Sequence, residues 1–477
     1  MRRKGRKDYM LRFWLLLLLV FAGTVGLYFL PEKIDTFEIK KVDMLSDLRI
    51  GDTVSIDLDS MGNAADNFIA QRAKKIKQLS PTDSVLQEEV EVAKRDSIYN
   101  KVKETRTDSS TQPFEDFSSS HRGLGRFFGA LKRSKSLNRP VRIAVLGDSF
   151  IEGDIFTCDL RKSLQSIYGG GGVGWVPITS EVAGFRRTVK HTFSGWNTHN
   201  MLHQRGRYTA SGYYFTPKEH NATVRYLLPG DSSKINTASL VSIYYTADKN
   251  VPAKLSINGA SEEIELPVSS SVNDYKWNGS KCKSAKLTIY QPEGVSLLGM
   301  SLEQQHGVTV DNFSLRGNSG LILSKLDLDY SKRLNTLRPY DLVILQYGLN
   351  VANAKQSDYS SYVKQMSKVI AHVKACFPSA DILIMGVSDR GVKTAEGFET
   401  MKTIYNFISA QQRIARDNGL VFWNTFLAMG GSGSMARLVM QGKAAKDYTH
   451  VGFPGGRIVA NAFMKAFNFE KAYYDAI

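Results

Sequence analysis

The sequence predicts a three-layer α/β domain built on a parallel sheet, interrupted by an all-β insert and preceded by a linker and a membrane anchor. Three observations support this fold class. From about residue 123 onward, short apolar runs alternate with amphipathic helical patterns, as in a parallel sheet covered on both faces. Residues 193–305 instead carry β-type runs separated by turn residues. Residues 13–30 are uncharged and predominantly apolar.

Residues 13–30, FWLLLLLVFAGTVGLYFL, form a candidate transmembrane helix. Their length just suffices for a hydrocarbon core of about 30 Å. Residues 1–12 are rich in Arg and Lys, so the positive-inside rule predicts a cytoplasmic N-terminus and an extracytoplasmic remainder. A cleaved signal peptide is the alternative, but the run exceeds a usual signal h-region and FLPEK offers no small-residue cleavage site. We therefore expect a single-pass protein of the cell membrane.

The charge and the cysteines limit the partners. The chain has 477 residues and a net charge of +16. With the folded part outside the cytoplasm, this charge indicates attraction to membrane or wall anions rather than to nucleic acid. Cys158, Cys282 and Cys376 are too widely spaced for a metal cluster or a disulfide framework, although one disulfide remains possible. No metal or cofactor is expected.

The segment 31–122 is rich in charge and in Ser, Thr and Asp, so it is expected to be an extracytoplasmic stalk or linker that cannot bury enough apolar surface to fold alone. The α/β domain then spans 123–192 and 306–477, on either side of the insert. We expect its strands at residues 142–147, 309–315, 341–347, 381–387 and 419–424. We expect its clearest helices at residues 159–168, 359–377, 398–417 and 455–467.

Ser149 directly follows the first apolar strand, in VRIAVLGDSFIEGD. In parallel α/β sheets the ligand site gathers at the carboxyl ends of the strands. Gly147 permits a sharp turn there, and the N–H groups at the start of a following helix can stabilise an anion. A serine that merely caps the helix is the alternative. A second GDS, at residues 230–232, has no following helix and indicates a hairpin turn in the insert.

A serine nucleophile needs a base, in this setting a histidine oriented by a carboxylate. His450 lies between the last strand and the last helix, and Asp447 precedes it by three residues, which puts both side chains on one face of a helical turn. Glu303 and His306 share that spacing. They precede the second strand, at the amino edge of the sheet, so we interpret them as structural or solvated.

Acyl transfer also needs hydrogen-bond donors aimed at the developing oxyanion. Asn350 offers a side-chain amide at the end of the third strand. The loop after the second strand offers backbone N–H groups, with Gly320 as first choice and Gly317 as second. Each residue alone is more typical of a turn. Their occurrence at successive strand ends predicts serine esterase chemistry.

This order of Ser, Gly, Asn and Asp-x-x-His resembles the SGNH, or GDSL-like, hydrolases, which implies a flavodoxin-like fold. A closer resemblance is to bacterial peptidoglycan O-acetylesterases with an inserted carbohydrate-binding-like, jelly-roll-like β-sandwich. It is carried by GDSFIEGDIFTCDLRKSL, YGGGGVGWVP, RGNSG, LQYGLN and DYTHVGFPGG. The resemblance implies that Ser149 is the nucleophile, His450 the base and Asp447 its orienting acid. It also implies an oxyanion hole made by the Ser149 N–H, Gly320 and Asn350.

The predicted function is that of a membrane-anchored serine esterase that hydrolyses O-acetyl esters on a cell-wall glycan, with peptidoglycan as the substrate that the resemblance implies. Acetyl transfer to a sugar hydroxyl and a non-catalytic wall-binding or scaffold role are the alternatives. In the insert, Tyr213, Tyr214 and Trp277 are candidates for binding glycan, with core filling as the other interpretation. The glycine-rich stretch 168–177 lacks the lysine of a phosphate-binding loop and is expected to be a shaped loop near the site.

Overall fold

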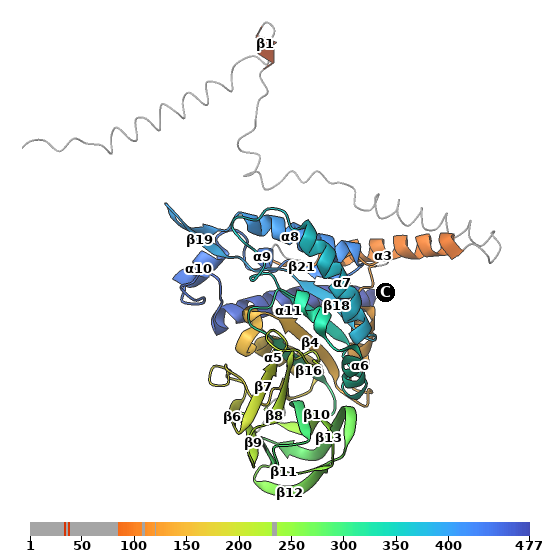
Figure 1. The fold of residues 1–477 in the computed structure, drawn as a ribbon. Helices are drawn as coiled ribbons and strands as arrows, with labels where there is room; N and C mark the ends of the chain where they lie inside the picture. Colours follow the sequence, from red (N-terminus) through yellow and green to blue (C-terminus); the bar gives the residue numbers. More distant parts are fainter. Residues whose placement is uncertain (1–32, 35–36, 39–83, 107–109, 120, 231–235) are drawn as a thin grey trace, which may run out of the picture. The chain divides into compact units, whose positions relative to one another are not determined.

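The computed structural model describes residues 33–34, 37–38, 84–106, 110–119, 121–230 and 236–477 (Figure 1). The chain divides into two compact units, Met1–Gln71 and Arg72–Ile477. In the first unit, β1 (Lys33–Ile34) and β2 (Phe37–Glu38) form an antiparallel pair. No helix among the described residues is both long and apolar enough to cross a membrane. The predicted anchor at 13–30 lies outside the described residues.

The second unit contains the predicted parallel sheet, with strand order β16-β4-β17-β18-β21-β3. The first five strands are parallel, and numbered along the chain they have the order 2-1-3-4-5 of flavodoxin-like folds. Their side chains are almost all buried, which explains the unbroken apolar runs in the sequence. The parallel strands are β4 (Val141–Gly147), β16 (Val308–Ser314), β17 (Leu342–Gln346), β18 (Asp381–Met385) and β21 (Val421–Trp423). All five predicted strands are therefore confirmed.

Helices pack around this sheet in two groups, whose members contact one another. One group is α4 (Gly125–Lys132), α5 (Thr157–Tyr168) and α11 (Phe453–Ala476). The other is α6 (Leu328–Leu337), α7 (Ser360–Cys376) and α8 (Thr403–Asp417). The shorter helices are η2 (Ser149–Asp154), η3 (Leu321–Lys325), α9 (Thr425–Ala428) and α10 (Ser434–Met440).

The sequence misplaced one helix start. Residues 391–400, part of which we assigned to a helix beginning at 398, form a hairpin of β19 (Gly391–Thr394) and β20 (Gly397–Thr400). The hairpin turns at Gly397, which has a φ of +131° that side chains rarely adopt. The helix α8 therefore begins at Thr403.

Part of the predicted linker is folded. α3 (Ser84–Arg106) packs against α11, and β3 (Glu115–Asp116) adds an antiparallel strand to the edge of the sheet beside β21. Phe114 is fully buried, and the indole N–H of Trp423 donates to the carbonyl of Gln112 at 2.9 Å. The folded α/β unit thus begins before residue 123, because a few apolar contacts suffice to dock this short segment.

The insert consists of two antiparallel sheets with a shared apolar core. The first has the order β13-β10-β15-β8-β7, with β5 also paired to β15, and the second has the order β12-β11-β14-β9-β6. The strands are β5 (Gly172–Val176), β6 (Lys190–Ser194), β7 (Trp196–Asn200), β8 (Tyr213–Pro217), β9 (Ala222–Leu227), β10 (Ala238–Ala247), β11 (Val251–Ile257), β12 (Ala260–Leu266), β13 (Ser269–Cys282), β14 (Ser284–Ile289) and β15 (Val295–Glu303). Of the second GDS, Asp231 and Ser232 lie outside the described residues.

The glycine-rich stretch is a buried strand rather than the expected loop. It forms β5, so the sandwich begins about twenty residues before the predicted boundary at 193. A Cβ atom at Gly172 would lie 2.2 Å from the carbonyl oxygen of Leu302, and one at Gly174 would lie 2.2 Å from Oδ1 of Asp311. Glycine is needed here because β5 passes closely between the insert and the parallel sheet.

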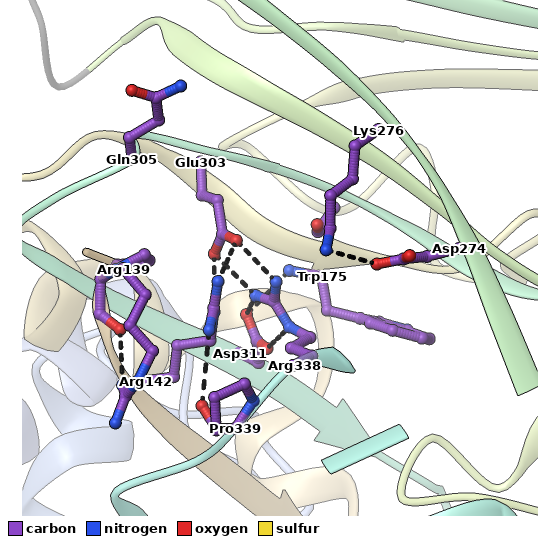
Figure 2. A network of polar contacts seen from close by, with 12 residues as sticks. Arg139, Arg142, Trp175, Asp274, Lys276, Glu303, Gln305, Asp311, Arg338 and Pro339 are labelled. Carbon is purple, nitrogen blue, oxygen red and sulfur yellow. Dashed lines mark hydrogen bonds and ion pairs between the residues drawn. The ribbon is translucent and has the colours of Figure 1, made fainter. Parts of the chain in front are cut away.

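A buried ion-pair network joins the insert to the parallel sheet (Figure 2). Glu303, at the end of β15, accepts hydrogen bonds from Arg142 of β4 and from Arg338. Arg338 also donates to Asp311 of β16 at 2.8 and 2.9 Å. Burial alone would raise the pKa of Glu303, but the two guanidinium groups outweigh it and lower the pKa to about 2. The structural interpretation of Glu303 is confirmed, and His306 lies exposed against the carbonyl of Leu137.

Candidate active site

Ser149 lies at the edge of the sheet where three strands end together. Gly147 of β4 is in register with Ser314 of β16 and with Gln346 of β17. A Cβ atom at Gly147 would lie 2.9 Å from the carbonyl oxygen of Gln346, so glycine allows the chain to turn there. Because the neighbouring strands lie on either side of β4, Ser149 occupies the topological switch point of the sheet, where ligands bind in such folds.

Ser149, His450 and Asp447 form one hydrogen-bonded chain. The Ser149 Oγ lies 2.8 Å from Nε2 of His450, and Nδ1 of His450 lies 2.7 Å from Oδ2 of Asp447. With the Nδ1 proton donated to the carboxylate, Nε2 is left as the acceptor for the serine proton. The structure thus brings together side chains from distant parts of the sequence. Ser149 and His450 are 301 residues apart.

Asp447 is held by the turn that carries the histidine. Its Oδ1 accepts the backbone N–H groups of Thr449 at 2.9 Å and of His450 at 3.0 Å. Partial burial alone would raise the pKa of Asp447, but the hydrogen bonds from the His450 ring and from these N–H groups outweigh it and lower the pKa. Asp447 is therefore a carboxylate at neutral pH and can stabilise a protonated imidazole.

The two glycines proposed as oxyanion donors differ in their availability. The N–H of Gly320 is buried and donates to the side-chain oxygen of Asn318 at 2.7 Å. Gly317 is exposed, and a Cβ atom there would meet no atom within 4 Å. A substrate can approach Gly317 without displacing an internal hydrogen bond, whereas Gly320 would have to give up its bond to Asn318. The geometry therefore favours our second choice, Gly317.

Asn350 is exposed just after β17 and faces the loop that contains Gly317 and Gly320. Its Nδ2 donates to the carbonyl of Asn318 at 3.1 Å and to Oδ2 of Asp148 at 3.3 Å. The bond to Asp148 is long for an N–H···O contact, so an oxyanion can compete for that hydrogen.

Asp148 is a site residue that the sequence analysis missed. Its side chain is fully buried, and it accepts the N–H of Phe150 at 2.9 Å, just beyond the serine. Burial raises the pKa of Asp148 to about 6, against the opposing effect of backbone N–H groups and of His450. The sequence contained one signal for this residue: Asp148 directly precedes the first turn of η2, and Asp is often the N-cap residue of a helix. Asp148 links the serine turn to Asn350.

A hollow of about 410 Å³ lies between the α/β part and the insert and is lined in part by the end of η2, the short helix that begins at Ser149. Glu152 and Arg316 line it from the α/β part, and Arg316 donates to Glu152 at 3.1 Å. Tyr213 lines it from the insert. Of the other two candidate aromatics, Tyr214 stacks on His199 with 4.3 Å between ring centroids, and Trp277 packs against the insert's core. Tyr213 alone of the three therefore lines this hollow.

The three cysteines lie apart from this chemistry. Cys158, Cys282 and Cys376 are all free, so the possible disulfide is not formed. Cys282 and Cys376 are buried, and burial raises the pKa of the Cys282 thiol to about 12. A thiol with so high a pKa is a poor nucleophile, which leaves Ser149 as the candidate.

A serine at the end of the first strand of a 2-1-3-4-5 parallel sheet, hydrogen-bonded to an Asp-x-x-His before the last helix, defines an SGNH-type hydrolase fold. The fold matches the solved structure of a peptidoglycan O-acetylesterase with a TM-score of 0.60 and 24% sequence identity, covering 76% of this chain and 99% of that chain. The match thus spans nearly the whole of that protein's structure.

Two further solved structures give weaker matches. One is an acetylxylan esterase from Geobacillus stearothermophilus, with a TM-score of 0.25 and 18% identity over 34% of this chain and 73% of that chain. The other is a family two carbohydrate esterase from Cellvibrio japonicus, with a TM-score of 0.20 and 8% identity over 48% of this chain and 85% of that chain. Comparison of the sequence with family models and with curated proteins found no match.

Proposed function

We propose that the protein is a serine esterase that hydrolyses O-acetyl esters on a cell-wall glycan, with peptidoglycan as its substrate. The observation that carries the proposal is the hydrogen-bonded chain from Ser149 through His450 to Asp447. The match of fold over the full length of a peptidoglycan O-acetylesterase supports the choice of substrate. The hollow lined in part by the end of η2, with its polar and aromatic side chains, is of a kind that suits a sugar.

The proposed reaction has two steps. The Ser149 Oγ attacks the carbonyl carbon of the acetyl ester while Nε2 of His450 accepts its proton. The N–H of Ser149, the N–H of Gly317 and the amide of Asn350 stabilise the oxyanion. His450 then protonates the departing sugar oxygen, which leaves an acetyl group on the serine. In the second step water attacks this ester, His450 takes the proton of water, and acetate departs as the proton returns to Ser149.

The proposal also assigns a location. Residues 13–30 would anchor the protein in the bacterial cell membrane as a single span, with the N-terminus cytoplasmic and the catalytic part extracytoplasmic. The absence of charge in this segment and the basic residues before it support this orientation. Protease added to intact spheroplasts should then digest the catalytic part while leaving a cytoplasmic marker protein whole.

The decisive experiment measures acetate released by the purified full-length protein from O-acetylated peptidoglycan and from acetylated xylan. We expect release from peptidoglycan, and a loss of several powers of ten in kcat for Ser149→Ala. Ser136→Ala, which changes an exposed serine remote from His450, serves as the matched control and should retain the wild-type rate. Equal acetate release by wild type and Ser149→Ala would instead favour the non-catalytic scaffold.

Hydrolysis and acetyl transfer are distinguished in the same assay. A soluble, unacetylated glycan oligosaccharide is added as acceptor, and acetate and acetylated oligosaccharide are measured together. Hydrolysis predicts that acetate accounts for the ester consumed. Acetylated oligosaccharide as the main product would replace the proposal with an acetyltransferase that uses the same catalytic residues.

A further inference from the structure

Residues 177–189, which connect β5 to β6, contact the two segments that directly follow Ser149 and His450 in the chain. The ring of Phe185 packs on the ring of Phe453 with 5.1 Å between centroids, and Phe453 follows His450 by three residues. Phe185 also rests on Gly153, where an added Cβ atom would lie 2.4 Å from its Cδ1. Gly153 is four residues beyond Ser149. This connection therefore forms part of the rim of the active site.

Buried polar contacts fix this part of the rim. Arg186 and Thr188 both bind Oδ2 of Asp154, at 3.3 Å and 2.5 Å. Arg161 of α5 pairs with the same carboxylate at 2.9 Å. Asp154 is fully buried, so its negative charge is matched within the fold by two guanidinium groups. The backbone on either side of residue 187 is consequently held in place.

Arg187 lies between these anchored residues and is exposed. Its Cζ lies 4.2 Å from the centroid of the Phe453 ring. A guanidinium that stacks on an aromatic face keeps the N–H groups along its edge available for a planar anion such as a carboxylate.

No carboxylate in the described part of the chain forms an ion pair with Arg187. Most acidic groups around the site already have partners of their own, and the exposed Glu181 acts on Arg316 and Tyr213. Glu152 pairs with Arg316, Asp154 with Arg161 and Arg186, Asp159 with Arg457, and Asp447 with His450. The edge of the Arg187 guanidinium is thus left for a group that comes from outside the fold.

We propose that Arg187 binds a carboxylate carried by the glycan close to the acetylated sugar, so that the enzyme prefers acidic acetylated glycans to neutral ones. The inference rests on the proposed esterase function and specifies its substrate class. A carboxylate can bind the guanidinium edge through two parallel hydrogen bonds, which also orients the sugar toward Ser149. Neutral acetylated xylan lacks this group. The carboxylate can belong to the glycan itself or to an attached peptide, and the two sources are distinguished below.

The test compares two forms of one substrate. O-acetylated peptidoglycan fragments are assayed before and after amidation of their carboxyl groups, which removes the charge and retains the ester. For wild type we expect kcat/KM to fall about tenfold on amidation, as for the loss of a charge-assisted hydrogen bond at a partly solvated site. In Arg187→Gln the two forms should react with nearly equal kcat/KM. Arg187→Lys should retain part of the difference because it keeps a point charge.

A matched control removes a different exposed cation nearby, at the start of β6. Lys190→Gln should keep the wild-type ratio of kcat/KM for the free and amidated substrates, which would separate a specific contact from the general effect of positive charge. An acetylated galacturonan, which is acidic but has no peptide, identifies the source of the carboxylate. If wild type has a higher kcat/KM for free than for amidated galacturonan, the carboxylate belongs to the sugar. If this difference occurs only with peptidoglycan, the carboxylate belongs to the peptide.

The outcomes separate this inference from the proposed function. The quantity compared is the ratio of kcat/KM for the free substrate to kcat/KM for the amidated substrate. A ratio near one in wild type, or the same ratio in Arg187→Gln and wild type, overturns the role of Arg187. Acetate release in that case still supports the proposed esterase function. Release of no acetate from any glycan would overturn both. The midpoint of thermal unfolding is measured for each variant. A midpoint equal to that of wild type verifies that the exposed substitution leaves the fold unchanged.

Discussion

The ring of Phe398 lies flat against the ring of Tyr448, with 3.5 Å between the centroids and 5° between the planes. Tyr448 belongs to the turn between Asp447 and His450 and has a φ of +56°, which is rare for a bulky residue. Its carbonyl accepts the N–H of Gly391 at 2.8 Å. The β19–β20 hairpin therefore contacts this turn through both a side chain and the backbone, and we expect Phe398 to position His450.

Phe398→Ala should lower kcat for a chromogenic acetate ester by about tenfold, because a small misplacement of a catalytic group is costly to the rate. KM should change less, since Phe398 does not contact the serine. Phe398→Tyr should restore the rate, a rescue that a general loss of stability would not predict. Tyr405→Ala removes another exposed ring, on α8, and should keep the wild-type kcat. An unchanged kcat in Phe398→Ala would show that the turn keeps its geometry without the hairpin.

Asp447→Asn should reduce kcat by about three to four powers of ten, because an amide facing Nδ1 favours the tautomer whose Nε2 carries a proton and cannot accept one. The lowered pKa of Asp447 keeps the native carboxylate charged at neutral and mildly acidic pH. A loss of activity as pH falls from 8 to 5 would therefore not be due to Asp447. Asp358→Asn, in an exposed loop, is the control. A loss below tenfold for Asp447→Asn would argue against the triad.

Asn350→Ala should reduce kcat by about 10²- to 10³-fold with little change in KM, since an oxyanion donor acts mainly on the transition state. Asn353→Ala alters an exposed asparagine in the same loop and should have little effect. Steady-state kinetics with the chromogenic ester provides the measurement. A rise in KM at constant kcat would mean that Asn350 binds the ground state instead.

The core of the fold could be predicted because its signals are local. Each parallel strand is buried on both faces and reads as one apolar run, and Ser149 and His450 each lie directly beside such an element. The strand β13 has a weak signal in the sequence for the opposite reason, since it lies at the edge of its sheet and most of its fourteen residues are partly or fully exposed. Its sequence, SSSVNDYKWNGSKC, carries no continuous apolar signal.

The details of the site depended on long-range contacts. The choice between Gly317 and Gly320 depends on the side chain of Asn318, which takes up the N–H of Gly320. Asp148 acquires its role only when β17 brings Asn350 to it, 202 residues later in the chain. Spacing along the sequence identifies the type of residue at a strand end, but it does not say which N–H groups remain available once the loops fold.

Arg338→Met should destabilise the protein by about 3–5 kcal/mol, because it removes the cation that Glu303 and Asp311 share in a fully buried site. Arg413→Met breaks an exposed pair with Asp417 on α8 and should cost less than about 1 kcal/mol. Urea unfolding of each variant gives the comparison. Similarly small losses of unfolding free energy in Arg338→Met and Arg413→Met would mean that water enters the buried network and screens its charges.

Glu470 of α11 is a buried carboxyl group at the contact with α3. Both of its side-chain oxygens lack a hydrogen-bond partner in the described part of the chain. Burial, together with the nearby Asp116, raises the pKa of Glu470 to about 8. Tyr99 and Tyr473 also face this group, and their rings pack together with 5.4 Å between centroids. Glu470 is therefore protonated in the folded protein at neutral pH.

The raised pKa of Glu470 makes stability depend on pH. Between the ordinary pKa of a glutamate and about 8, the folded state holds a proton that the unfolded state has released, so stability falls as pH rises through this range. Glu470→Gln should remove this loss: at pH 9 it should be more stable than wild type, by at most about 5 kcal/mol, and at pH 5 nearly equal. Urea unfolding at both pH values measures this, with exposed Glu396→Gln as control. If the free energy of unfolding of Glu470→Gln differs from that of wild type by the same amount at pH 5 and pH 9, Glu470 is not a buried neutral carboxyl group.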